Sequence, residues 1–320
     1  MINRLVLLAA VMCLPVFLVA QASQAPAQPG TAETKPAPPS GRQPVQAKSQ
    51  AEYQAYQSAF ANTQNAQAME HASDDFAAKF PDSELRVLLY RTAMHSYQTV
   101  GNSEKMMEMG LKVLAIDKDD PEALIGVAEV QEEHTSPSDL DRDERMTQAI
   151  TNARHALETI DTDLAVPGGI PPDRVEAYKK YLRSTALAII GTIQYKREQY
   201  ADAETNLRKA IETDASNPDA VVILRLTLAL DQEKKYPEAL QQANRAVELT
   251  QEDNDIGKMA RNERDRLMIQ TGKSNAPGGS NAPGNTPGAA PGSSAPPAET
   301  APGSTTPPAN APQNPAPPSH

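Results

Sequence analysis

The chain has 320 residues, of which 39% are hydrophobic and 4% aromatic, and its formal net charge at pH 7 is −11. Arg4 and residues 23–48 together carry +3 and residues 272–320 are neutral, so residues 49–271 carry −14. Nucleic-acid phosphates and anionic lipids repel such an acidic body, so nucleic acid is not an expected partner. The one cysteine, Cys13, lies in an N-terminal apolar run, and cleavage of that run would exclude disulfides and thiolate metal sites.

Residues 1–22 have the pattern of a secretory signal peptide. A basic residue precedes the apolar residues 5–20, and Ala20-Gln21-Ala22 has the spacing of a cleavage site. We therefore expect an exported protein, periplasmic or extracellular, with no stable membrane insertion after cleavage. Retention of the segment as an anchor is the alternative, although 16 apolar residues interrupted by Pro15 are few for a spanning helix.

Two further segments are too poor in apolar residues to bury a core. Residues 23–48 contain six prolines among Gln, Ala and Ser, and residues 272–320 consist mainly of Pro, Ala, Gly, Ser and Thr. We expect both segments to be disordered, the first as a linker and the second as a tether or spacer. Residues 49–271 remain for one folded domain of ordinary size.

The clearest periodicity lies in residues 184–217, where apolar residues recur at helical spacing along two short stretches. The second stretch is repeated 36 positions later, which predicts two successive helix pairs. Small residues are expected where two helix axes come close together. Residues that pack the repeats are therefore expected at Gly191, Tyr200, Ala203, Leu207, Ala210, Tyr236, Ala239, Ala243 and Ala246.

This recurring pattern resembles the tetratricopeptide repeat (TPR), a helix pair of about 34 residues. The resemblance implies an all-α fold, a solenoid of antiparallel helix pairs stacked side by side. Residues 134–137 and the Pro- and Gly-rich residues 161–174 are expected to lie in long connections. Helix pairs are expected near residues 51–80, 85–120, 121–160, 175–217 and 220–253, followed by a capping helix at 255–270.

Residues that could support catalysis or bind a metal do not occur in the required patterns. The five histidines form no HExxH motif or paired ligand spacing. The acidic stretch 139–143 lacks the glycine and the closing carboxylate of a calcium loop, and the helix dipole explains its acidity better. No glycine-rich phosphate loop or GxSxG elbow occurs. We expect no enzyme activity, no cofactor and no bound metal.

The resemblance also implies that the first helix of each pair lines a concave face, which holds a peptide or a partner helix. The partner-binding candidates on this face are Arg91, His95, Ile125, Glu129, Thr192, Tyr195, Leu224 and Leu228. Family members that grip a C-terminal carboxylate use Lys, Asn and Arg here, and this chain departs from that pattern almost everywhere. A mixed apolar and acidic face favours an amphipathic or basic segment. The two leucines have a second interpretation, as core residues beneath the closing helix.

We therefore predict an exported bacterial TPR protein that acts as a protein–protein interaction module or assembly scaffold in the cell envelope. Two alternatives stay open: an accessory or regulatory subunit of an envelope enzyme or export complex, and a structural spacer tethered by its Pro-rich tail. A large residue at Ala203 or Ala239 should overpack the helix pair. Glu204, expected on the surface, should tolerate replacement by Gln.

Overall fold

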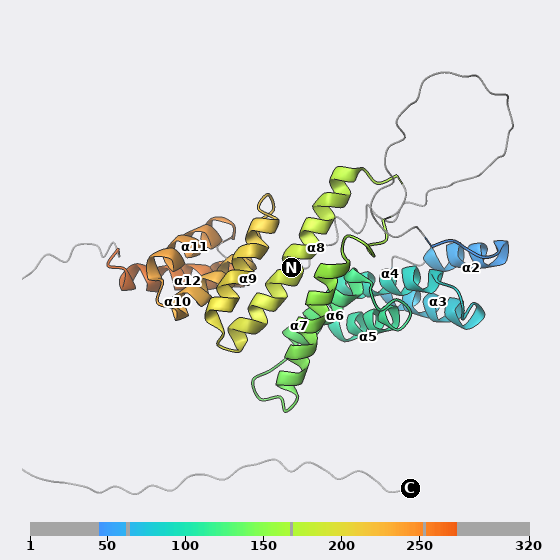
Figure 1. The fold of residues 1–320 in the computed structure, drawn as a ribbon, viewed down its shortest axis with the longest axis horizontal. Helices are drawn as coiled ribbons and strands as arrows, with labels where there is room; N and C mark the ends of the chain where they lie inside the picture. The colour runs from blue at the N-terminus through green and yellow to red at the C-terminus, as the bar shows by residue number, and fades with distance from the viewer. Residues whose placement is uncertain (1–44, 62–64, 167–168, 252–253, 274–320) are drawn as a thin grey trace, which may run out of the picture. The chain divides into compact units, whose positions relative to one another are not determined.

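A computed structural model of the chain describes residues 45–61, 65–166, 169–251 and 254–273, and the regular elements within these ranges are α-helices (Figure 1). The expected signal peptide, most of the expected linker and nearly all of the expected tail lie outside the described residues. The described helices pack against their sequence neighbours, which confirms the predicted all-α class of stacked helix pairs.

The helices form pairs joined by short connections, and a last helix follows the final pair. The first helices of four of these pairs are α4, α6, α8 and α10. The helices are α2 (Gln50–Phe60), α3 (Ala66–Lys79), α4 (Leu85–Thr99), α5 (Ser103–Leu114), α6 (Pro121–Glu133), α7 (Arg142–Thr159), α8 (Pro172–Lys196), α9 (Tyr200–Thr213), α10 (Ala220–Gln232), α11 (Tyr236–Glu248) and α12 (Asp255–Gln270).

Short polar side chains mark where several helices begin. Asn65, Asn102, Asp120, Asp219 and Asn254 each accept a hydrogen bond from a backbone N–H in the first turn of the helix that follows. These bonds satisfy donors that have no partner within the helix. Helix α8 begins at Pro172, inside the segment expected to be non-helical, because proline is well tolerated in a first helical turn.

The connections α4–α5, α8–α9 and α10–α11 have the same backbone geometry. Each contains one residue in the left-handed region, namely Gly101 (φ 72°), Glu198 (φ 61°) and Lys234 (φ 61°). In each, the next residue's N–H donates to the carbonyl five positions earlier, with N···O distances of 2.9–3.0 Å. Residues 198 and 234 are 36 positions apart, so the sequence repeat is also a repeat of the turn.

Small residues allow α8 and α9 to approach closely. A Cβ atom added to Gly191 would lie 2.7 Å from Cγ of Leu207 and 3.2 Å from the carbonyl oxygen of Ala203. Tyr200 and Tyr236, at the starts of α9 and α11, are only half-buried. The other residues expected to pack the repeats are fully buried in the apolar core shared by α8–α12: Ala203, Leu207, Ala210, Ala239, Ala243 and Ala246.

Glu204 is not the surface residue that we expected. Its side chain is 14% exposed and bonds to Nε of Arg208 at 2.6 Å and to Nζ of Lys235 at 2.5 Å. Lys235 lies in the turn before α11, so this carboxylate links α9 to the next helix pair. These contacts change the expectation for Glu204→Gln from a neutral effect to a loss of stability.

Arg145 contacts two carboxylates of the acidic stretch before α7. The Arg145 guanidinium bonds to Asp139 and, at 2.9 Å, to Asp141. Asp143 and Glu144 lie in the first turn of α7, where the helix dipole favours negative charge. The stretch is thus explained by contacts within the loop and helix.

Candidate partner-binding groove

The first helices α4, α6, α8 and α10 supply most of the lining of two small hollows. The larger has a volume of about 50 Å³ and lies mainly between α6, α8 and α10. The smaller has a volume of about 20 Å³ and lies mainly between α4, α6 and α8. Glu129, Tyr181 and Thr185 line both hollows. We refer to the two hollows together, with the residues that line them, as the inner groove.

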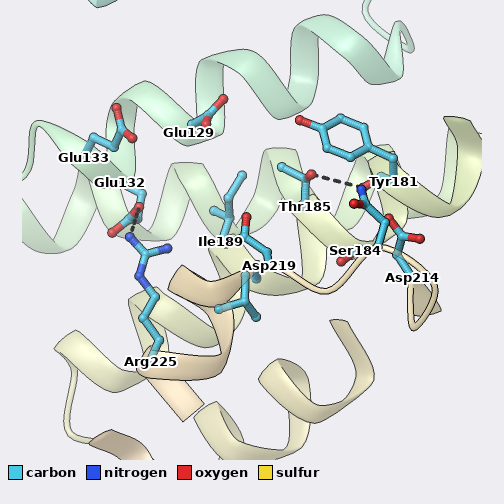
Figure 2. A pocket seen from close by; sticks show the side chains of 13 residues that line it. Glu129, Glu132, Glu133, Tyr181, Ser184, Thr185, Ile189, Asp214, Asp219 and Arg225 are labelled. Carbon is cyan, nitrogen blue, oxygen red and sulfur yellow. Dashed lines mark hydrogen bonds and ion pairs between the residues drawn. The ribbon is translucent and has the colours of Figure 1, made fainter. Parts of the chain in front are cut away.

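The larger hollow is rich in carboxylates, as Figure 2 shows. Arg225 is the one basic residue in its lining. Between the acidic groups lie Tyr181 and Thr185 of α8, and the Thr185 hydroxyl donates to the Tyr181 carbonyl at 3.0 Å. The carboxylates come from α6 and from the segment that leads into α10: Glu129, Glu132, Glu133, Asp214 and Asp219.

One of these carboxylates is compensated by cations. Glu132 is buried, and its Oε1 lies 2.7 Å from Nζ of Lys196 at the end of α8. Its Oε2 lies 3.8 Å from a guanidinium nitrogen of Arg225 on α10. Both cations near the larger hollow are therefore engaged with Glu132, which ties α6 to α8 and α10.

Glu129, in contrast, has no such compensation. Its carboxylate is half-buried, and Nε2 of Gln98 on α4 lies 3.4 Å from Oε2. Among the described residues, no cation forms an ion pair with Glu129 within 4.0 Å. Burial, and after it the charges of Glu133 and Glu132, raise the pKa of Glu129 to about 7. Within the part of the chain that the structure describes, the centre of the groove thus holds a carboxylate with an amide neighbour and no directly paired cation.

Arg91, predicted to contact a partner, instead belongs to a buried ion cluster. Its guanidinium bonds to Asp120, and its Nε lies 3.0 Å from Oε2 of Glu122. The Tyr178 hydroxyl of α8 donates to the same Glu122. Although burial opposes ionisation, Arg91 and His95 keep the pKa of Glu122 below its usual value. The cluster joins α4, α6 and α8 beneath the smaller hollow, which makes Arg91 a structural residue.

Two polar atoms in the smaller hollow have unused hydrogen-bonding capacity. Nδ1 of His95 and Oε1 of Gln98 are buried, and neither has a hydrogen-bond partner among the described residues. Nε2 of His95 lies 3.8 Å from Glu122. Buried polar atoms are normally paired, because an unpaired one costs about 1–3 kcal/mol. A bound polar group would satisfy these two.

Of the remaining predicted candidates on the first helices, Ile125 lines a hollow, whereas Thr192 and Tyr195 do not. Ile125 is 5% exposed and lines the smaller hollow. Thr192 is buried and its hydroxyl donates to the Ala188 carbonyl at 2.7 Å. Tyr195 is half-buried, and its ring centroid lies 5.6 Å from that of Tyr200.

The two leucines of α10 lie away from both hollows. Leu224 is 3% exposed and belongs to the apolar core of α8–α12, which supports its alternative interpretation as a core residue. Leu228 is half-buried. The inner groove therefore contains His95, Ile125 and Glu129 of the predicted set.

Several lining residues were missed by sequence reasoning. Tyr181 lies in the part of α8 that precedes the repeat, and Asp214 lies in a connection, so neither falls at a repeat position. Tyr181 stacks on Tyr178, with ring centroids 6.2 Å apart. The spacing of Glu129, Glu132 and Glu133 places three carboxylates on one helix face, and this signal could have revealed the acidity of the groove.

The described part of the chain contains neither a membrane-spanning helix nor a metal-binding group of side chains. None of its helices has the length and apolar character needed to cross a bilayer. Nor do the residues with described positions include a group of three or more His, Cys, Asp or Glu side chains arranged to hold a metal ion.

Comparison with known proteins gives little further information. No protein-family model matches the chain, and no curated protein matches it. Among solved structures, the chain is similar to the crystal structure of the APC/C hetero-tetramer Cut9-Hcn1, with 16% sequence identity and a TM-score of 0.43. The match covers 68% of this chain and 39% of that chain, so this chain spans well under half of that neighbour's length. A likeness this distant says nothing about partners or activity.

Proposed function

We propose that this chain is a protein–protein interaction module whose inner groove binds a basic or amphipathic segment of a partner protein. The observation that carries the proposal is the excess of carboxylates in the larger hollow. Five carboxylates face one guanidinium, and that guanidinium is already near Glu132. A cationic segment would gain attraction to the remaining carboxylates, in a partly buried setting where salt screens charges less than in bulk water.

The size of the hollows supports a macromolecular partner rather than a small substrate. Pockets that enclose a small molecule usually have volumes of about 300–1,000 Å³. The hollows here have volumes of about 50 and 20 Å³, enough for the ends of individual side chains. The lining residues come mainly from four helices and form two hollows. This arrangement suits a peptide that lies along the surface and places side chains in each hollow.

The groove also has an apolar part. Ala188, Ile189 and Val222 line the larger hollow, and Met94, Ile125 and Leu182 line the smaller one. A segment with apolar side chains on one face and basic ones beside them would match this mixture. This agrees with the amphipathic or basic ligand expected from the sequence.

The proposal can be tested by fluorescence anisotropy with the full-length chain. The probe is a labelled amphipathic peptide of about 14 residues made of leucine and lysine, and its control has glutamate in place of lysine. We expect the lysine probe to bind with an affinity that falls as salt is added, and the glutamate probe not to bind. Equal binding of the two probes, or no binding of the lysine probe, would contradict the proposal.

A charge-reversed variant locates the binding on the molecule. Glu133→Lys combined with Asp214→Lys should strongly weaken binding of the lysine probe, because both positions line the larger hollow. The matched control is Glu248→Lys with Glu212→Lys, which makes the same change of charge outside the groove lining. Similar losses in both double variants would show that only net charge matters.

The role in a bacterial cell envelope, as a scaffold, an accessory subunit of an envelope complex or a spacer, rests on the pattern of residues 1–22 and on the tail composition. We propose export on that ground. Mass spectrometry of the protein produced with its N-terminal segment should give a mature chain that begins at Ser23 in an extracytoplasmic fraction. Recovery of the intact chain from the cytoplasm would contradict export.

A further inference from the structure

We propose that Glu129 is the anchor of the inner groove and that its carboxylate pairs with one lysine or arginine side chain of the bound segment. This inference rests on the proposed function and adds the residue that recognises the partner and the chemical group that it recognises. The partner segment must then carry a basic side chain at the point that meets Glu129, flanked by apolar or further basic residues.

Position is the first reason for choosing Glu129 over the other carboxylates. It lies on α6, the middle of the three helices α4, α6 and α8 around the smaller hollow, and it lines the larger hollow as well. Tyr181 and Thr185 of α8 line both hollows beside it. A segment that crosses from one hollow to the other must therefore pass Glu129.

Among the residues that the structure describes, no cation lies within ion-pair distance of Glu129, and the nearby Arg225 acts on it from farther away. On α4, His95 and Gln98 line the smaller hollow, and on α8 the nearest lining groups are neutral hydroxyls. The cations Lys196 and Arg225 face Glu132 at 2.7 and 3.8 Å. The charged groups that surround the groove are Arg91, Glu122, Glu132, Glu133, Lys196, Asp214, Asp219 and Arg225, with His95 as a further titratable group.

Unpaired hydrogen-bonding atoms next to Glu129 also favour a bound cationic group. Oε1 of Gln98 is buried and unpaired, and the Nε2 atom of the same amide is the group 3.4 Å from Glu129. An ammonium or guanidinium group carries several N–H donors. One such group placed at Glu129 could donate both to the carboxylate and to the free amide oxygen, satisfying two polar groups at once.

Because the pKa of Glu129 is raised to about 7, the carboxyl is largely protonated below that pH. A cation binds the ionised form, so binding must release the proton. Affinity should then rise with pH and be about tenfold higher near pH ~8 than near pH ~6. Lysine and arginine in the probe keep their charge throughout this range.

The experiment measures the affinity of the full-length chain for the leucine–lysine probe near pH ~6 and pH ~8. We expect Glu129→Gln to weaken binding about tenfold at the higher pH and to remove most of the dependence on pH. The matched control is Glu212→Gln, which removes the same charge from an exposed position outside the groove lining. It should weaken binding less than about threefold and keep the pH dependence.

Two further variants test whether the pH dependence of binding comes from the Glu129 carboxylate. His95→Gln should leave the ratio of affinities at the two pH values unchanged, which separates Glu129 from the histidine of the smaller hollow. Glu129→Asp keeps the charge but withdraws it by one methylene, so it should retain the pH dependence with weaker binding. If Glu129→Gln loses its helical circular dichroism signal, Glu129→Asp takes its place in the comparison.

The possible outcomes separate this inference from the proposed function. If the wild-type chain binds the probe but Glu129→Gln behaves like Glu212→Gln, the proposed function holds and Glu129 is not the anchor of the groove. If His95→Gln abolishes the pH dependence, the titrating group is the histidine and the assignment is wrong. If the wild-type chain fails to bind the probe at either pH, the proposed function fails and the anchor fails with it.

Discussion

Replacing Gly191 by Ala tests whether close contact between α8 and α9 requires the absence of a side chain. The added Cβ would lie 2.7 Å from Cγ and 3.1 Å from Cδ2 of Leu207, and 3.2 Å from the Ala203 carbonyl oxygen. Leu207 is completely buried, and the carbonyl belongs to the helix backbone. Neither can give way without disturbing the packing of the pair.

Two opposing contributions set the change in the free energy of unfolding. Overpacking a filled core costs about 1–3 kcal/mol. Alanine in place of glycine in a helix interior gains about 1 kcal/mol in intrinsic propensity. We therefore expect Gly191→Ala to lower the free energy of unfolding by about 1 kcal/mol. In a Leu207→Ala background the main clash is absent. The same replacement should there raise the free energy of unfolding by up to about 1 kcal/mol.

The assay is urea unfolding of the four chains of this double-mutant cycle, followed by far-ultraviolet circular dichroism. We expect Gly191→Ala to change sign between the two backgrounds, with a coupling free energy of about 1–3 kcal/mol. Additive effects of the two substitutions would refute the reasoning, because the added Cβ and the Leu207 side chain would then not compete for space.

Three further predictions concern ion pairs and turns, each measured as a change in the free energy of unfolding. Glu204→Gln should cost about 1 kcal/mol, whereas Glu238→Gln, whose side chain is 55% exposed, should change little; equal effects would contradict the assigned contacts. Gly101→Ala should cost about 1–2 kcal/mol through its backbone angle alone, and Lys234→Gly should be neutral or gain up to about 1 kcal/mol. A loss on Lys234→Gly would show that the side chain outweighs the strain. Arg91→Met should cost about 3–5 kcal/mol because it leaves two buried carboxylates without their cation, and an unchanged unfolding midpoint would refute that role.

The helical architecture could be predicted from the sequence because its signals are local. The spacing of Ala203, Leu207 and Ala210 marks one face of one helix, and its recurrence 36 positions later marks the next pair. Several helix starts are similarly local, since each of these depends on one capping side chain and the residues directly after it. These signals need no knowledge of distant contacts.

The groove was harder to predict because its character depends on distant partners. Arg91 has the position of a groove residue, but Asp120 and Glu122, about thirty residues later, bury its charge. Among the described residues, the nearest cations of the larger hollow, Lys196 and Arg225, form their ion pairs with Glu132 and not with Glu129. Periodicity places side chains on a face, and it does not show which charges there are compensated.

We propose that the face built by α6, α8 and α10 is the surface on which a basic segment binds. Hydrogen–deuterium exchange of the full-length chain, with and without a saturating leucine–lysine probe, tests this most directly. We predict increased protection in peptides that cover residues 129–133, 181–189 and 219–225, with little change across α11 and α12. Protection confined to α11 and α12, or to residues beyond 273, would contradict the claim.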